Sequence, residues 1–243
     1  MSIGTSLAIK RVSIALLLIA LIVQVGSSHN ASAVDTVPPD SNPSTTAVPT
    51  TIPAPLKPKD IVKISKINTK DPVVFITIDD GATVSKELAK VLDKNDLPVT
   101  TFAMPEMIWR ERKWYRARQN MTFENHTNTH AQMTTISARN QKIELCEASK
   151  LIKQIMGERP IMYRPPRGSW SDENRVAMAK CGLKYAVLWS VVIENDVPQN
   201  IVFRKGDIIL FHYVPSLPNV LPQILKILKQ QKLQPALLRD YLQ

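Results

Sequence analysis

Short apolar runs alternate with segments of helical periodicity along residues 60–243. The run 73–78 is continuous, apolar and rich in β-branched residues, which is typical of a strand buried on both faces of a parallel sheet. The apolar residues that follow it recur at helical spacing, at Val84, Leu88, Val91 and Leu92. This strand-then-helix unit recurs, and the pattern predicts further strands over 99–104, 121–124, 161–163, 185–189, 207–212 and 234–237.

The predicted helices carry end signals. Ser137 can cap a long helix and Gly157 can end it, and Ser171 and Gly182 mark the ends of the next helix in the same way. The apolar stripe of the long helix is Leu145, Ala148, Ile152 and Ile155, and that of the last helix is Val220, Ile224 and Leu228. Alternating strands and helices predict a parallel α/β fold, either an open sheet or a barrel with fewer than eight units.

Residues 1–59 differ in composition from the rest of the chain. Lys10 and Arg11 precede an apolar run over 12–25, and small residues follow at 31–33, so residues 1–33 are expected to be a secretory signal peptide. An uncleaved signal that tethers the protein is the alternative, although the run is shorter than the roughly 20 residues of a spanning helix. Residues 34–59 are rich in Pro, Thr and Ser and predict a disordered, extended linker. We therefore expect a secreted or cell-surface protein with one domain, 60–243.

Composition and charge narrow the possible partners. Hydrophobic residues make up 44% of the 243 residues and charged residues 21%, the balance of a globular protein with a packed core. The net charge is +10, but the basic residues are scattered and accompany no nucleic-acid-binding motif. We therefore expect association with an anionic cell wall or membrane surface and not with nucleic acid. No stable protein partner is implied.

The chain has two cysteines, Cys146 and Cys181, and both fall in predicted helices. Export would permit a disulfide between them. Two small buried side chains are the alternative. The sequence leaves the pairing open.

Titratable residues follow several of the predicted strands. Asp79 and Asp80 end the first strand, His126 follows the third, Arg164 the fourth, and His212 ends the sixth. Each has an ordinary structural explanation, such as a capped turn for the Asp-Gly pair or an ion pair for the arginine. In parallel α/β folds, however, the carboxyl ends of the strands meet at one rim, so we expect these side chains to share a pocket.

His130 stands four residues after His126, a spacing at which two imidazoles on a helical turn can bind one metal ion. Taken alone, the pair is more typical of surface histidines. Two histidines and one carboxylate form a facial set with open coordination positions. One of the two neighbouring aspartates could bind the cation, and the other could accept a proton from water. Arg164 would then keep that base ionised.

Four segments, in this order, resemble the motifs of the polysaccharide deacetylase family, also called the NodB-homology domain or carbohydrate esterase family 4. They are Thr77-Ile78-Asp79-Asp80-Gly81, the pair His126 and His130, Arg164-Pro165-Pro166-Arg167-Gly168, and Leu210-Phe211-His212. The resemblance covers nearly the whole domain. It implies a distorted (β/α) barrel with about seven parallel strands, a hydrolase acting on carbon–nitrogen bonds of a polysaccharide or oligosaccharide, and one divalent metal ion, usually Zn²⁺.

The resemblance also implies a role for each matching residue. Asp79 would be the general base, His212 the general acid, and Arg164 the residue that orients Asp79. The metal ligands would be Asp80, His126 and His130. The backbone N–H of Arg167 would stabilise the oxyanion, and Trp189 and Leu210 would line the pocket for the acetyl methyl group.

The chain departs from the family pattern after the fifth strand, where an acidic residue followed by Trp is usual. That acid is replaced by Asn195 or displaced to Glu194 or Asp196, which leaves open what tunes His212. Arg167 also stands where an aromatic residue is usual. The expected function is deacetylation of a GlcNAc-containing glycan, either peptidoglycan or a chitin-like polymer. The alternatives are an O-acetyl esterase acting on xylan-like polymers and a catalytically impaired glycan-binding homologue.

Overall fold

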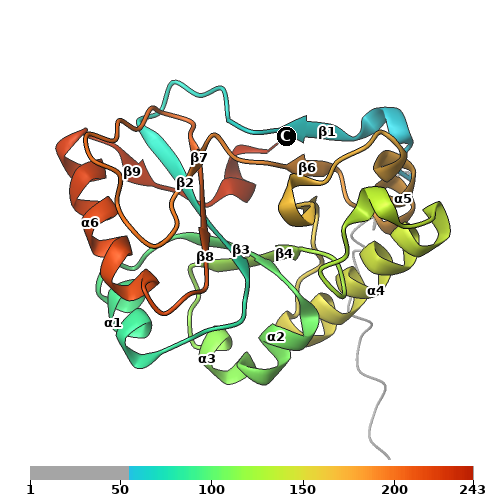
Figure 1. Cartoon of the computed structure of the whole chain (residues 1–243), viewed down its shortest axis with the longest axis horizontal. Helices are drawn as coiled ribbons and strands as arrows, with labels where there is room; N and C mark the ends of the chain where they lie inside the picture. Colours follow the sequence, from blue (N-terminus) through green and yellow to red (C-terminus); the bar gives the residue numbers. More distant parts are fainter. Residues whose placement is uncertain (1–54, 243) are drawn as a thin grey trace, which may run out of the picture. The chain divides into compact units, whose positions relative to one another are not determined.

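The computed structural model describes residues 55–242, and within this range the chain forms one curled sheet of parallel strands with helices outside it (Figure 1). The expected signal peptide, and the expected linker except for 55–59, lie outside the described residues. The sheet order is β1-β6-β5-β4-β3-β2-β8-β7, with β9 added to β2. The strands are β1 (Val62–Ile64), β2 (Val73–Asp80), β3 (Val99–Ala103), β4 (Met121–Asn125), β5 (Met162–Tyr163), β6 (Tyr185–Val187), β7 (Val191–Val192), β8 (Ile208–His212) and β9 (Gln234–Pro235).

The helices lie on the outer side of the sheet. In Figure 1, α1 and α6 cover one flank and α4 and α5 the opposite one, with α2 and α3 between them. The α-helices are α1 (Lys86–Lys94), α2 (Pro105–Arg110), α3 (Arg112–Arg116), α4 (Ala138–Met156), α5 (Glu173–Cys181) and α6 (Leu217–Gln230). Short 3₁₀ helices are η1 (Pro58–Asp60), η2 (Met133–Thr135), η3 (Pro166–Gly168) and η4 (Leu238–Tyr241). The parallel half-barrel confirms the expected distorted (β/α) fold.

Strand β2 shows how the sequence divides the core into two layers. Val74, Ile76 and Ile78 pack with residues of α1 and α6 in the core outside the sheet. The alternate residue Phe75 packs with Phe102 of β3 and Ile208 of β8 in the core inside the curl. Because side chains alternate along a strand, Thr77 and Asp79 face the same interior as Phe75. The polar end of this inner row is the start of the candidate site.

The helix ends largely follow the sequence signals. The Ser137 hydroxyl accepts a hydrogen bond from the backbone of Asn140 at the start of α4, and Gly157 ends that helix with φ 91°. The expected cap at Ser171 is wrong, because Asp172 is the N-cap residue of α5. The Asn174 side chain instead accepts a hydrogen bond from the Ser171 backbone (3.0 Å). A disulfide joins Cys146 of α4 to Cys181 of α5, which settles the pairing that the sequence left open.

Several short elements have no counterpart in the sequence pattern. Strands β1 and β7 have only three and two residues and include exposed positions, so neither is long enough to show a strand pattern in the sequence. Helices α2 and α3 are also short. Among residues 55–242, no helix has both the length and the apolar character needed to cross a membrane.

Candidate active site

Two consecutive carboxylates end β2 at the mouth of the curled sheet. The Gly81 N–H donates to the Asp79 carbonyl (3.1 Å), so the strand ends in a three-residue turn with Asp80 at φ 78°. This turn directs both carboxylates toward the same imidazole. Asp79 Oδ2 lies 3.8 Å and Asp80 Oδ1 3.6 Å from His126 Nε2. Asp79 is buried, whereas the Asp80 side chain is 26% exposed.

The two histidines come from the loop that follows β4, and not from a helical turn as the spacing suggested. Thr127 and His130 have positive φ angles of 67° and 59°, which interrupt any helical path. The rings nevertheless converge, with centroids 5.0 Å apart, and His130 Nε2 lies 3.5 Å from Asp80 Oδ1. The predicted convergence is therefore correct, although a left-handed loop produces it.

Asp80, His126 and His130 fit a divalent metal ion. One ligand atom from each lies within 4.8 Å of the others. Asp80 Oδ1 is buried and has no hydrogen-bond partner among the described residues, as expected of an oxygen that binds a cation. The Arg164 carbonyl accepts a hydrogen bond from His126 Nδ1 (2.8 Å), so Nε2 of the neutral ring presents its lone pair to the carboxylates. Burial lowers the pKa of His126, which favours this neutral form.

Arg164 lies wholly inside the curled sheet, directly behind Asp79. Its Nη1 donates to Asp79 Oδ1 (2.7 Å) and to the Thr77 hydroxyl (2.8 Å). Nε and Nη2 donate to the carbonyls of Val187 and Leu188, each at 3.2 Å. Burial lowers the pKa of the guanidinium and the Asp79 carboxylate opposes that shift. With four oxygen acceptors the group stays cationic and holds the Asp79 carboxylate in one orientation.

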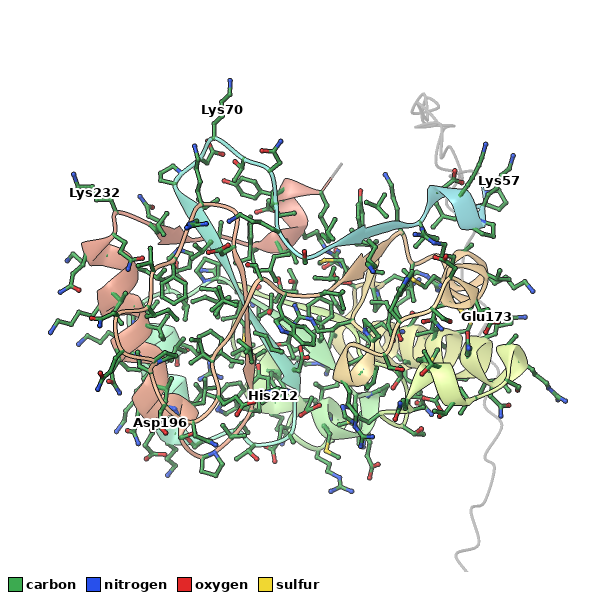
Figure 2. The ribbon with its side chains drawn as sticks, turned by 45° about the horizontal axis from the view of Figure 1, so that its top comes forward. Lys57, Lys70, Glu173, Asp196, His212 and Lys232 are labelled. Atoms are coloured by element: carbon green, nitrogen blue, oxygen red, sulfur yellow. A yellow bond between two sulfur atoms is a disulfide. The ribbon has the colours of Figure 1, made fainter. Side chains whose placement is uncertain are left out.

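His212 ends β8 beside Asp79, its partner in the register of the two parallel strands. Its label in Figure 2 lies in the lower part of the view, at the carboxyl end of β8. Leu210, two residues earlier on the same strand, is buried. Trp189 lies partly buried and its ring contacts the position of Gly168, where a Cβ would be 3.3 Å from Trp189 Cη2. Strand register thus brings His212 to the rim, as the sequence predicts.

Arg167 adopts a left-handed backbone conformation, with φ 57° and ψ 19°, inside η3. Its exposed side chain reaches the Gln132 amide oxygen (Nη1 to Oε1, 3.4 Å). The segment is tethered at both ends, because the Arg164 backbone N–H donates to the Asn125 carbonyl (2.9 Å) and the Ser169 hydroxyl bonds to the Thr134 hydroxyl (2.7 Å). Arg167 thus belongs to a fixed loop beside the histidine loop.

The segment after β6 supplies no acidic partner to His212. Among residues 55–242, no carboxylate oxygen lies within 4.0 Å of a His212 ring nitrogen. Glu194 and Asp196 are exposed, and Asn195 Oδ1 accepts a hydrogen bond from Ser216 (3.0 Å). The acidic partner that the family resemblance implies for His212 is therefore not found among the described residues.

Sequence reasoning missed the polar residues that support the site. The Thr77 hydroxyl and the Asp79 carboxylate accept hydrogen bonds from the same nitrogen of Arg164. The Asn125 amide oxygen accepts a hydrogen bond from the Thr127 backbone (2.8 Å), and Glu144 of α4 binds the loop between the two histidines. The alternation of β2 could have placed Thr77 on the Asp79 face. The contact of Glu144, made across 15 or 16 residues, had no local signal.

The fold and the motifs of this site match one family of proteins. A profile of the family described as polysaccharide deacetylase matches residues 66–186. The chain is 30% identical over 170 residues to a chitooligosaccharide deacetylase of Sinorhizobium fredii, covering 61% of this chain and 75% of that protein. The chain belongs to the polysaccharide deacetylase family.

Two other similar proteins limit what membership of this family implies about activity. An uncharacterised protein of Streptomyces coelicolor is 28% identical over 147 residues, and the match spans 59% of this chain but only 58% of that protein. The solved structure of a CE4 family pseudoenzyme of Bacillus anthracis, BA3943, has a TM-score of 0.64 at 21% identity, with 75% of this chain and 69% of that one covered. Because the fold also occurs in a pseudoenzyme, turnover has to be argued from the site.

Proposed function

We propose that this chain is a metal-dependent deacetylase that hydrolyses N-acetyl groups of a GlcNAc-containing glycan, either peptidoglycan or a chitin-like polymer. One observation carries the proposal. Asp80 Oδ1, which has no hydrogen-bond partner within residues 55–242, lies 3.6 and 3.5 Å from the Nε2 atoms of His126 and His130. It lies directly beside the buried pair of Asp79 and Arg164. A possible ligand set and a separate carboxylate paired with an arginine therefore lie side by side.

Each residue of the site has a defined task in this reaction. Asp80, His126 and His130 would hold a divalent ion, for which we propose Zn²⁺. When bound, such an ion supplies positive charge to the acetyl carbonyl and acidity to a water molecule. Asp79, which is not needed as a ligand, would accept the proton of the attacking water, because Arg164 holds its carboxylate in one orientation.

The second half of the reaction breaks the carbon–nitrogen bond. His212 would donate a proton to the sugar nitrogen as the bond to the acetyl carbon breaks, so that acetate and a free amine leave. The backbone N–H of Arg167 would stabilise the oxyanion, and Trp189 and Leu210 would enclose the methyl group. The Sinorhizobium fredii relative, named a chitooligosaccharide deacetylase, supports an N-acetyl substrate.

Acetate release tests this function directly. Purified 55–243 would be incubated with chitooligosaccharides, peptidoglycan and acetylated xylan, in Zn²⁺ and after chelation. We expect acetate from an N-acetyl glycan, its loss on chelation and its return with metal. Release from acetylated xylan alone would favour an O-acetyl esterase. No release from any substrate with any divalent metal would refute the proposal.

A second candidate, a glycan-binding homologue with impaired turnover, is favoured by the lack of a carboxylate within 4.0 Å of His212 among the described residues. It predicts oligosaccharide binding without acetate release, and this binding should be unchanged by Asp79→Asn.

For location we propose a secreted or surface-held protein on the basis of residues 1–33. Appearance of a form beginning at Val34 in the culture medium would support this, and a full-length protein in the membrane fraction would indicate a tether.

A further inference from the structure

Glu144, on the inner face of α4, binds the loop that carries the two histidines. Its Oε2 accepts hydrogen bonds from the backbone N–H groups of Asn128 (2.9 Å) and Thr129 (2.8 Å), and its Oε1 accepts one from the Thr129 hydroxyl (2.8 Å). Both carboxylate oxygens are therefore used by the loop. Glu144 is not among the residues that could hold the metal ion. Its hydrogen bonds within residues 55–242 all go to the chain between the two proposed ligands.

The loop needs such an attachment because of its backbone. Thr127 and His130 are non-glycine residues at positive φ, each of which costs about 1–3 kcal/mol unless the surroundings fix it. The left-handed path leaves the N–H groups of Asn128 and Thr129 without partners in a helix or sheet. A carboxylate that accepts both of them forms charge-assisted hydrogen bonds, which are stronger than neutral ones. Glu144 thus stabilises a loop conformation that the sequence alone disfavours.

The other end of the loop is attached to the same helix. The Asn125 side-chain amide donates to the Leu145 carbonyl (2.8 Å) and to the Ser149 hydroxyl (2.9 Å), while its oxygen accepts from Thr127 N–H. The disulfide at Cys146 joins this stretch of α4 to α5. Helix α4 is therefore the fixed base against which the histidine loop is held.

We infer that Glu144 is a positioning residue that fixes His126 and His130 at the separation needed to share one divalent ion. The inference rests on the proposed metal site. It assigns to Glu144 neither proton transfer nor metal binding. Removing the carboxylate would release the loop between the ligands and lower metal affinity, as loss of groups that orient metal ligands typically does by about 10- to 100-fold.

The test compares three variants by competition between protein and a chromophoric chelator for Zn²⁺. We expect Glu144→Ala to weaken Zn²⁺ binding about 10- to 100-fold. Glu144→Gln keeps an oxygen for the N–H donors and should lose only about fivefold, the difference between a charged and a neutral acceptor. Glu147→Ala is the matched control on α4, because Glu147 is exposed and its ion pair within residues 55–242 is with Lys150 (3.6 Å). It should bind like the unmodified protein.

Two further readouts separate positioning from general destabilisation. The visible spectrum of bound Co²⁺ should change in Glu144→Ala and not in Glu147→Ala. In the metal-free proteins, amide hydrogen exchange at Asn128 and Thr129 should accelerate at least about tenfold in Glu144→Ala only. If this variant does not fold, Glu144→Gln and Thr129→Val, which removes one donor, carry the comparison. Thr129→Val should weaken binding by about threefold to tenfold.

The outcomes are distinct. Equal Zn²⁺ affinity and unchanged exchange in Glu144→Ala would overturn the inference and leave the proposed function intact. A loss of affinity in Glu147→Ala as large as in Glu144→Ala would also overturn it. Absence of metal binding by the unmodified protein would instead overturn the metal site itself, and the positioning role with it.

Discussion

The buried ion pair of Arg164 and Asp79 permits a quantitative test of the site. The side chains are 0% and 4% exposed, and Nη1 lies 2.7 Å from Oδ1. We propose to neutralise each partner alone and then both, as Arg164→Met, Asp79→Asn and the double variant. These residues approximate the original volumes and carry no charge. The free energy of unfolding of the four proteins forms a double-mutant cycle.

The expected energies follow from burial. Charges about 4 Å apart attract by about 4 kcal/mol at the effective dielectric constant of about 20 that describes protein interiors. Removing one partner leaves a buried charge without compensation and should cost about 3–5 kcal/mol. Removing both eliminates that penalty, so the double variant should lose less than the sum of the single losses. We expect a coupling energy of about 2–4 kcal/mol.

Urea unfolding in the presence of a chelator measures this coupling without a contribution from bound metal. The exposed pair of Glu147 and Lys150, separated by 3.6 Å on α4, is the control. Screening by solvent should limit its coupling to about 0.5 kcal/mol. If the losses of unfolding free energy in the two single variants sum to the loss in the double variant within about 0.5 kcal/mol, the two charges are not energetically coupled. The argument that Arg164 stabilises and orients the Asp79 carboxylate would then fail.

Three further predictions concern activity and stability. Asp79→Asn should lower acetate release by about 10²- to 10⁴-fold with unchanged Zn²⁺ affinity in chelator competition; a matching loss of affinity would make Asp79 a ligand. Replacing Cys146 and Cys181 by Ser should lower the free energy of unfolding in urea by about 2–4 kcal/mol, and reductant should reproduce this loss in the unmodified protein but not in the variant. Gly206→Ala should destabilise by more than about 2 kcal/mol, because its Cβ would lie 1.9 Å from a backbone oxygen at φ 83°. Gly157→Ala, at φ 91° with nothing within 4 Å, should lose only about 1 kcal/mol, and equal losses would contradict the steric argument.

The long, strongly patterned elements could be predicted from the sequence. The apolar run of β2 and the stripe of α4 bury enough surface to fix their type, and the end residues Ser137 and Gly157 mark the ends of α4. Strands β1 and β7 could not be found in this way. They are held by pairing with β6 and β8, so their conformation depends on tertiary neighbours more than on their own residues.

The site was predictable to the extent that it depends on strand register. Parallel pairing places His212 opposite Asp79, as expected for residues at the carboxyl ends of strands. The supporting contacts are different in kind. Glu144 reaches Asn128 and Thr129 from another element, and a glutamate on an amphipathic helix carries no local sign of such a partner. The sequence motifs therefore identified the residues proposed to act in the reaction. The residues that orient them, such as Glu144, were found only in the structure.

Backbone strain explains why the loop conformations of the site could not be predicted from the sequence. Four of the seven non-glycine residues with positive φ in the described chain are Asp80, Thr127, His130 and Arg167, which all belong to the site. Local propensity would place glycine at such positions. Asp80 and His130 are two of the proposed metal ligands, and on that proposal the strain at these positions is retained for their side chains. Hydrogen bonds from Gly81 to Asp79 and from Ala131 to the Thr127 hydroxyl sustain it, because strained conformations persist only where surrounding contacts fix them.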